Sequence, residues 1–203
     1  QHKTSNFYED YLPEDFDGEK QQLDELKNRV DARKPDIQRF LSTLETLIEE
    51  TNDWIQIKAL CDSIPFSEWD WAPYKNSQVF FNAKTMKIDK MASDLYQLCG
   101  NMDLMPVTVE GELSQSMYGA MSVILCGDPC LSFELKLSTV MAMRKHRIAI
   151  NHAARAKGHL DIDYCSEMLR AAKFESSQST TNFIAMSWAV QSGSWLLYPQ
   201  AGI

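Results

Sequence analysis

The sequence contains no apolar run of the roughly 20 residues that a membrane-crossing helix needs, so we expect no membrane span. It also lacks an excess of basic side chains, because Asp and Glu total 28 against 20 Lys and Arg and the formal net charge is -8. Nucleic acids and anionic membranes attract basic surfaces, so this charge disfavours the chain as a whole as a binder of either. No basic and apolar leader is visible, and we expect the chain to be a fragment of a longer protein.

Cysteine is scarce and odd in number, with five residues spread through apolar segments. Small secreted proteins that are held together by disulfides use even and densely spaced sets. A structural zinc site needs two ligand pairs, and Cys126-x3-Cys130 has no second pair at a standard spacing. These absences predict reduced, buried cysteines, an intracellular protein, and neither a structural metal nor a cofactor.

The chain does have enough apolar sequence for a sizeable core, since 44% of its 203 residues are hydrophobic. This length suits one domain, or a domain with an appendage. Residues 1–18 form an acidic leader with interleaved aromatic side chains. Such a segment is either solvated or a docking segment that folds on a partner or on the domain itself, and both interpretations stay open.

Residues 19–85 are predicted to be a helical N-terminal region. Apolar side chains recur at helical spacing before Pro35 and again from Ile37 to Ile48. Because proline suits the first turn of a helix and breaks an interior, Pro35 predicts the start of a second helix. Asp53, or its neighbour Asn52, can cap a third, short helix. We therefore expect a helical hairpin followed by a short helix, with a charged outer face.

A proline- and tryptophan-rich loop over residues 65–82 follows these helices. Its tryptophans are flanked by Glu68 and Asp70. Stacking on nucleic acid would need basic neighbours, so a packing role is favoured for this loop. We expect the apolar side chains of the helices and the loop to form a face for a partner or a second copy. The predicted interaction face consists of Leu23, Leu26, Val30, Phe40, Trp69 and Trp71.

The second half of the chain is predicted to be mostly helical with a few short strands, which is an α+β pattern. A Gly127-Asp128-Pro129 break separates two long apolar segments. The expected helices cover residues 85–99, 116–125, 131–147, 162–172 and 183–190, and the expected strands cover 107–109 and 195–198.

Several short motifs occur in a fixed order between about residues 90 and 200. They are Leu95-Tyr96, Val109-Glu110-Gly111, the run from Ser116 to Ser122, Leu125-Cys126-Gly127, the run from Leu131 to Val140, Ala185-Met186-Ser187 and the run from Trp195 to Pro199. In this ordered set the chain resembles the OTU (ovarian tumour) cysteine-protease fold, and more closely its vertnin-like branch. The resemblance implies an OTU-like domain with a small short-stranded sheet over residues 86–203.

Enzymes of that family carry Asp-Gly-x-Cys at the start of the central helix, where the helix N-terminus lowers the thiol pKa, and a late histidine acts as base. Here the four positions read Leu113-Ser114-Gln115-Ser116, and no histidine follows the segment from Trp195 to Tyr198. The resemblance therefore implies a catalytically degenerate domain, with Ser116 at the nucleophile position. The expected function is a non-catalytic interaction or scaffolding module of a nuclear, transcription- or chromatin-linked protein, with dimerisation through the N-terminal helices as one mode.

An active cysteine hydrolase for ubiquitin-like substrates is an alternative. It requires a thiol within hydrogen-bond reach of a histidine. Cys126 and Cys130 stand at the predicted break, and three histidines, His146, His152 and His159, follow them. Buried structural cysteine is the commoner outcome for such residues.

A third alternative is binding of nucleic acid, or of another phosphate or acidic peptide, by the segment 144–158, which contains no acidic residue. Basic residues at a helix end also complement the helix dipole, so a solvated helix end is the simpler interpretation. The acidic leader 1–18 could itself be the partner of this cluster. The basic cluster consists of Arg144, Lys145, Arg147, Arg155 and Lys157.

Overall fold

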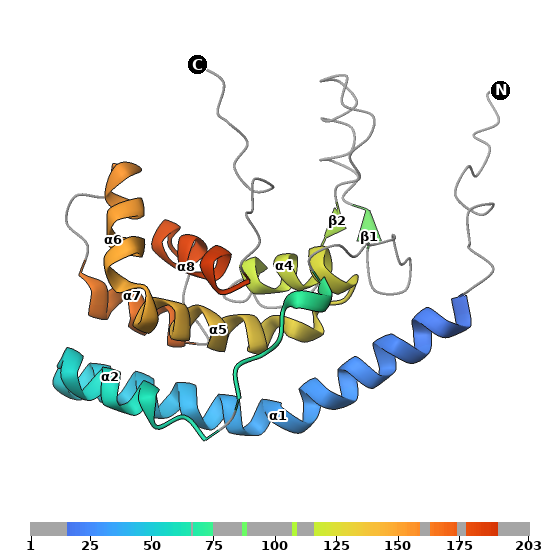
Figure 1. Ribbon diagram of the computed structural model, residues 1–203, viewed down its shortest axis with the longest axis horizontal. Coiled ribbons are helices and arrows are strands. Elements are labelled where there is room, and N and C mark those ends of the chain that lie inside the picture. The colour runs from blue at the N-terminus through green and yellow to red at the C-terminus, as the bar shows by residue number, and fades with distance from the viewer. Residues whose placement is uncertain are drawn as a thin grey trace, which may run out of the picture.

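The computed structural model describes residues 16–65, 67–74, 87–88, 107–108, 116–158, 163–173 and 178–190. Within these residues the chain is mostly helical, and the helices pack against one another (Figure 1). The helical elements are α1 (Phe16–Thr51), α2 (Trp54–Asp62), η1 (Ala72–Tyr74), α4 (Ser116–Cys126), η3 (Pro129–Leu131), α5 (Ser132–Lys145), α6 (Arg147–Ala156), α7 (Tyr164–Ala172) and α8 (Thr180–Val190).

Two very short strands, β1 (Lys87–Ile88) and β2 (Val107–Thr108), pair antiparallel, with Lys87 opposite Thr108. This pairing corrects the beginning of the helix predicted over residues 85–99, because the backbone of β1 bonds across a ladder instead of along a helix. A ladder of two residues on each strand does not define the small sheet of an OTU-like domain.

Some predictions concern residues that the structure does not describe. They include most of the leader 1–18, the remainder of the 85–99 helix and the strand at 195–198. Among the helices that are described, none is both long and apolar enough to cross a membrane.

The hairpin predicted for the N-terminal region is wrong, because α1 continues through Pro35 as one helix. A proline in a helix interior removes a backbone hydrogen bond and costs about 3 kcal/mol. The apolar side chains on both sides of it are buried, with Val30 at 2% and Ile37 at 0% exposure, and their burial offsets this cost. Proline also bends a helix, and the two halves of α1 run at different slopes in Figure 1.

The chain turns between α1 and α2 at Asn52, whose φ of 47° lies in the left-handed region that asparagine tolerates. Asp53 then caps α2, as predicted, because its carboxylate accepts a hydrogen bond from the Ile55 backbone N at 2.8 Å. Helix α2 contacts both α1 and α5 and buries Ile57 and Cys61.

Helix α5 lies at the centre of the described fold. Nine of its fourteen residues are buried, which is possible because it contacts each of the other described α-helices. The sequence predicts a single helix over 131–147, but α5 ends at Lys145 and α6 begins at Arg147. The intervening His146 keeps its backbone bond to the Ala142 carbonyl at 2.8 Å while the chain changes direction.

The other helical predictions for the second half are confirmed where the residues are described, with small shifts at the helix ends. The predicted break after α4 is confirmed as well. Gly127 has a φ of 75°, a left-handed conformation that glycine adopts without strain. Asp128 then accepts a hydrogen bond from the Cys130 backbone N at 3.0 Å and so caps η3.

Two apolar clusters share these helices, and α5 and α8 contribute to both. One, the α7 cluster, joins the second half of α1 to α2, α6 and α7. The other, the tryptophan cluster, joins the first half of α1 to α4 and to the segment between α2 and η1. Members of the α7 cluster include Ile37, Phe40, Leu41, Leu44, Ile57, Val140, Met143, Ile150 and Met168, and members of the tryptophan cluster include Leu26, Val30, Trp69, Trp71, Tyr118, Leu131, Leu135 and Met186.

Candidate functional site

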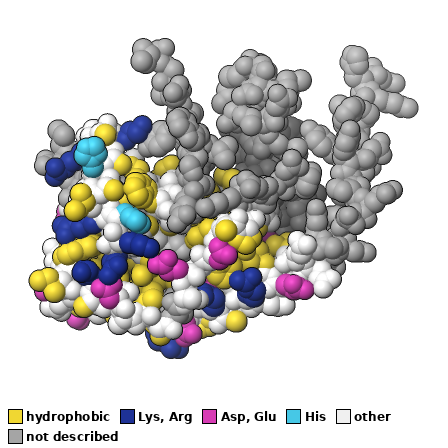
Figure 2. All heavy atoms as spheres, in the orientation of Figure 1, with side chains coloured by type: hydrophobic (Ala, Val, Ile, Leu, Met, Phe, Trp, Pro, Cys, Tyr) yellow, Lys and Arg dark blue, Asp and Glu magenta, His cyan; other side chains and the backbone are white. Residues whose placement is uncertain are grey.

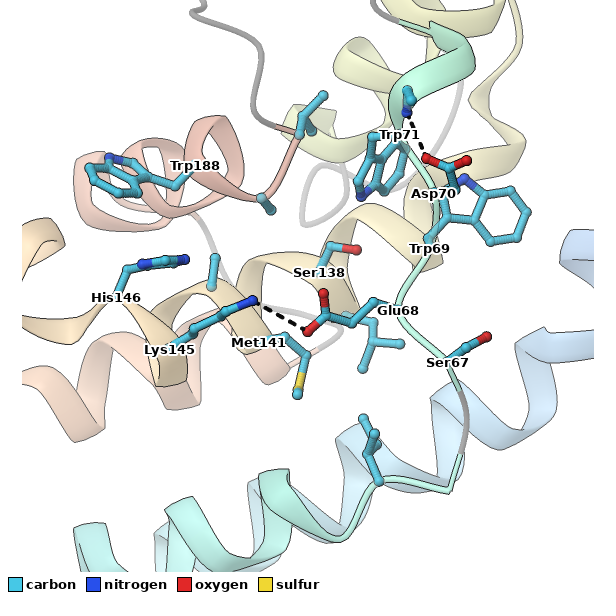
Figure 3. Close-up of a pocket in the computed structure, with 16 residues that line it drawn as sticks. Ser67, Glu68, Trp69, Asp70, Trp71, Ser138, Met141, Lys145, His146 and Trp188 are labelled. Atoms are coloured by element: carbon cyan, nitrogen blue, oxygen red, sulfur yellow. Dashed lines mark hydrogen bonds and ion pairs between the residues drawn. The ribbon is translucent and has the colours of Figure 1, made fainter.

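A pocket of about 200 Å³ opens where the segment after α2 passes over α5 and α8 (Figure 3). Its walls combine tryptophan rings, other apolar side chains and six polar or charged residues. The residues that line it are Ile64, Ser67, Glu68, Trp69, Asp70, Trp71, Ala72, Leu137, Ser138, Met141, Ala142, Lys145, His146, Trp188, Ala189 and Val190.

Aromatic rings stand on two sides of this pocket. Trp188 of α8 is 44% exposed, and its ring centroid lies 5.1 Å from that of His146. On the other side, Trp71 projects from the 67–71 segment toward α8, whereas Trp69 lies on the far side of that segment in Figure 3. The two tryptophans of the segment still touch, with centroids 6.3 Å apart. An entering group would therefore meet the exposed ring of Trp188 and, deeper in the pocket, the buried ring of Trp71.

The charged groups of the pocket lie at its edge. Glu68 and Lys145 are both exposed, and their charged atoms are 3.9 Å apart, which is a weak, solvent-screened pair. Asp70 is exposed as well and accepts a hydrogen bond from the Ala72 backbone N at 3.0 Å. The floor of the pocket is apolar, because Leu137, Ala142 and Val190 are buried there. An apolar side chain with a neighbouring cation would match these surroundings.

A buried ion pair fixes the position of the 67–71 segment. Glu134 of α5 is fully buried, and the Arg33 guanidinium donates to its two carboxylate oxygens at 2.6 and 3.2 Å. The same guanidinium donates to the Ser67 carbonyl at 3.0 Å and lies 5.4 Å from the Trp69 ring. Burial raises the pKa of Glu134, and Arg33 opposes that rise. Helix α1 thereby holds one wall of the pocket against α5.

The residues predicted as an interaction face lie inside the fold. Leu26, Val30, Trp69 and Trp71 are buried in the tryptophan cluster, and Leu23 packs against it. Phe40 is buried in the α7 cluster. The expectation that the tryptophans have a packing role is confirmed, and a partner would have to contact other side chains of this region.

The predicted basic cluster is divided by internal contacts. Arg144 forms an ion pair with Asp62 at the end of α2, and Lys145 faces Glu68. Arg147 lies over the rings of Trp54 and Tyr164, with distances of 4.5 and 5.4 Å to their centroids. Figure 2 shows Lys and Arg side chains mixed with acidic and apolar ones on the described part of this face.

The remaining two basic residues, Arg155 and Lys157, are exposed at the end of α6. They lie away from α2, whose Asp62 forms the ion pair with Arg144. The five basic residues thus lie at the two ends of α6, with Arg144, Lys145 and Arg147 at its start and Arg155 and Lys157 at its end.

The thiols at the break after α4 meet each other. The Sγ atoms of Cys126 and Cys130 are 4.0 Å apart, and Cys126 Sγ lies within hydrogen-bond distance of the Ser122 and Asp128 carbonyl oxygens. His146, by contrast, stacks on Trp188, and no hydrogen bond between a thiol and a histidine occurs among the described residues. Ser116, which the resemblance predicts to stand at the nucleophile position, is the first residue of α4.

The described cysteines are free thiols, and Cys61 is the most enclosed of them. Its burial raises its pKa to about 12, which makes it a poor nucleophile at neutral pH. No group of three or more candidate metal ligands occurs in the part of the chain that the structure describes.

Sequence reasoning missed Trp188 as a surface residue, because the apolar run from Phe183 to Val190 indicates a helix buried on every side. The neighbouring residues of the pocket come from three distant segments, and only their contacts identify it. Comparisons with protein-family models, with curated proteins and with solved structures find nothing that matches this chain.

Proposed function

We propose that the chain is a non-catalytic protein-interaction module whose pocket receives an apolar side chain of a partner peptide, next to a Lys or Arg of that peptide. The single observation that carries this proposal is the pocket between Trp71 and Trp188. A half-exposed tryptophan beside an enclosed apolar floor is the kind of anchor point around which binding energy concentrates in protein interfaces.

The charge at the pocket edge selects the partner's chemistry. Glu68 and Asp70 are two exposed carboxylates two residues apart on one irregular segment. Lys145 lies 3.9 Å from Glu68, and among the described residues no ion pair with Asp70 occurs. A cationic residue of the partner would be attracted to this edge, and an acidic one would be repelled. An apolar residue flanked by Lys or Arg is therefore the occupant that we propose.

The proposal also covers the context of the module. The ordered motifs of the second half resemble a vertnin-like branch of the OTU fold, and that resemblance supports a scaffolding role in a nuclear regulatory protein. Ser116 at the nucleophile position supports a pseudo-enzyme. A second copy of the chain, if it binds through the N-terminal helices, would contact the exposed side of α1, because the side that carries Leu26 and Val30 is buried.

Peptide selection followed by affinity measurement tests this function. Peptides selected from a random library against the full chain should share an apolar residue next to Lys or Arg. Trp188→Ala should weaken their binding about tenfold or more, because losing a contact with one large aromatic ring removes about 1.5–3 kcal/mol. Ile148→Ala is the matched control, since Ile148 is 87% exposed on α6 and does not line the pocket.

Charge reversal provides the second arm of the test. Glu68→Lys combined with Asp70→Lys should weaken the selected basic peptides and lessen the salt dependence of their binding. Selected peptides that bind Trp188→Ala and the charge-reversed variant as well as the original chain would place recognition elsewhere and refute the proposal.

The hydrolase alternative has its own test. A ubiquitin probe that carries a thiol-reactive vinyl sulfone should leave the chain unlabelled, because the described thiols contact carbonyl oxygens and one another rather than a histidine. Labelling of Cys126 by this probe, lost in Cys126→Ser, would show that the chain is an enzyme.

A further inference from the structure

Two cysteines meet at the sharp turn between α4 and α5. Cys126 is the last residue of α4, Gly127 turns the chain with a φ of 75°, and Cys130 lies within η3. Their Sγ atoms are 4.0 Å apart, and both thiols are free and partly exposed. Two thiols in contact and open to small solutes can react with each other in a way that isolated thiols cannot.

Hydrogen bonds between side chains and the backbone, together with one ion pair, fix the turn around the two sulfurs. The Ser122 hydroxyl donates to the Asp128 carbonyl and accepts from the Leu131 backbone N at 2.9 Å. The Asp128 carboxylate accepts from the Cys130 backbone N at 3.0 Å and is 2.7 Å from Lys27 Nζ of α1. These contacts hold the ends of the turn, and the Cys126 thiol also contacts the Ser122 and Asp128 carbonyl oxygens at 3.3 and 3.2 Å.

The two thiols differ in acidity. The pKa of Cys126 is lowered, chiefly because the Cys130 thiol donates a hydrogen bond to it, although burial and the Asp128 carboxylate oppose this effect. The pKa of Cys130 is raised by the same hydrogen bond and by burial. Cys126 is thus the more acidic of the two thiols.

We propose that Cys126 and Cys130 form a dithiol modification site that a hydroperoxide converts to an intramolecular disulfide. The thiolate of Cys126 attacks the terminal oxygen of hydrogen peroxide, the O–O bond breaks, and a sulfenic acid forms with release of hydroxide, which takes up one proton to become water. The Cys130 sulfur then attacks the Cys126 sulfur and displaces a second water. Overall, two thiols and one peroxide give one disulfide and two waters.

The geometry suits this closure and its reversal. An S–S bond is about 2.05 Å long, so the sulfurs must approach each other from 4.0 Å, which rotation of the two side chains can supply. The ring that closes spans only a few residues, and short rings gain little stability from cross-linking. A small dithiol reductant should therefore reopen the disulfide and restore both thiols.

Oxidation of the full chain with hydrogen peroxide, followed by alkylation, unfolding and digestion, tests the site. A protease that cuts before Asp128 separates Cys126 from Cys130, so their two fragments stay joined only if the disulfide has formed. We expect this joined pair as the main oxidised product, a loss of two hydrogens from the intact mass, and release of both fragments by dithiothreitol. Cys165→Ser is the matched control and should leave the product unchanged.

Two variants separate the roles of the sulfurs. In Cys130→Ser a sulfenic acid should accumulate at Cys126 and be trapped by dimedone. In Cys126→Ser the oxidation of Cys130 should be at least about tenfold slower, because the thiolate is the reactive form. Competitive alkylation of the unmutated chain, read cysteine by cysteine, gives the same ranking without any substitution.

Three results would overturn the proposal. They are a disulfide that joins either cysteine to Cys61, Cys99 or Cys165, a link between two chains as the main product, and equal alkylation rates for Cys126 and Cys130. None of these results depends on the pocket between α5 and α8, so the outcome is independent of the proposed peptide binding.

Discussion

Replacing Arg33 by methionine should destabilise the protein more than any exposed charge change, because it leaves Glu134 buried and unpaired. Glu134 is fully buried, and the two hydrogen bonds from Arg33, at 2.6 and 3.2 Å, satisfy both of its carboxylate oxygens. Removal of one partner of a buried ion pair costs about 3–5 kcal/mol. Because the Arg33 side chain is still 25% exposed, we expect the lower end, about 3 kcal/mol.

Urea denaturation followed by circular dichroism measures this free energy of unfolding. The melting temperature should fall by about 6–12 °C for a chain of this size. Arg33→Met combined with Glu134→Met should recover most of the loss, since no buried charge then remains. Arg39→Met is the control, because its pair with Asp36 is exposed and should contribute less than about 1 kcal/mol.

The pH dependence provides a further check on the same pair. The folded-state pKa of Glu134 is raised, so its protonation favours the folded chain at low pH and that stability is lost as the pH rises. Without Arg33 the pKa rises further, and the cost of Arg33→Met should shrink as the solution is acidified from pH 7. A cost below about 1 kcal/mol, or a cost unchanged when Glu134 is also replaced, would refute the reasoning.

Three other substitutions test separate features. Burial lowers the pKa of Lys136 from 10.5 to about 8. Between these two values the unfolded chain binds more protons than the folded chain, so the free energy of unfolding should rise with pH, by about 1.4 kcal/mol per pH unit near the middle of this window. Lys136→Met should remove this slope in urea titrations. Pro35→Ala should stabilise the protein by about 1 kcal/mol or more, because alanine restores a backbone hydrogen-bond donor inside α1. The melting temperature should therefore rise, and a lower melting temperature would contradict this explanation. Asp163→Ala should lower the free energy of unfolding by about 1 kcal/mol, because the Asp163 carboxylate caps α7 by accepting from the Cys165 backbone N at 3.2 Å. Calorimetry measures this loss, and an unchanged melting temperature would show that the cap is dispensable.

The helices of the second half could be predicted because their signals are local. Asp128 and Pro129 follow Gly127 at the end of α4, and helical periodicity marks both flanking segments. Asp53 could be identified as a cap for the same reason, since a capping side chain bonds to the backbone two residues away. Such interactions depend on neighbouring residues and need no knowledge of the fold.

The passage of α1 through Pro35 could not be predicted in this way. The local rule is correct that proline weakens a helix, but the burial of apolar side chains on both sides of it depends on α5 and the other helices that cover them. Tertiary packing therefore outweighs a local preference of about 3 kcal/mol. The antiparallel pairing of Lys87–Ile88 is equally invisible locally, because its partner is twenty residues away.

The candidate site was only partly accessible from the sequence. Trp69 and Trp71 could be recognised as packing residues, because acidic neighbours argue against nucleic-acid stacking. Their proximity to Trp188 arises from the contact of α5 with α8, which no short-range pattern encodes. The internal contacts of the basic cluster could not be predicted for the same reason, since Asp62 and Trp54, which engage Arg144 and Arg147, come from another helix.

The position of Pro35 divides α1 into two stretches that serve different clusters. Leu26 and Val30 precede it and pack with the tryptophans, whereas Ile37 and Leu41 follow it and pack against α7 and its neighbours. The helix has one fewer backbone bond between these stretches, so they can exchange their amide hydrogens as separate cooperative units. Opening of the first unit alone would release Arg33 and the wall of the pocket while the α7 cluster stays folded, so the pocket wall should open at a lower free energy than the rest of the described fold.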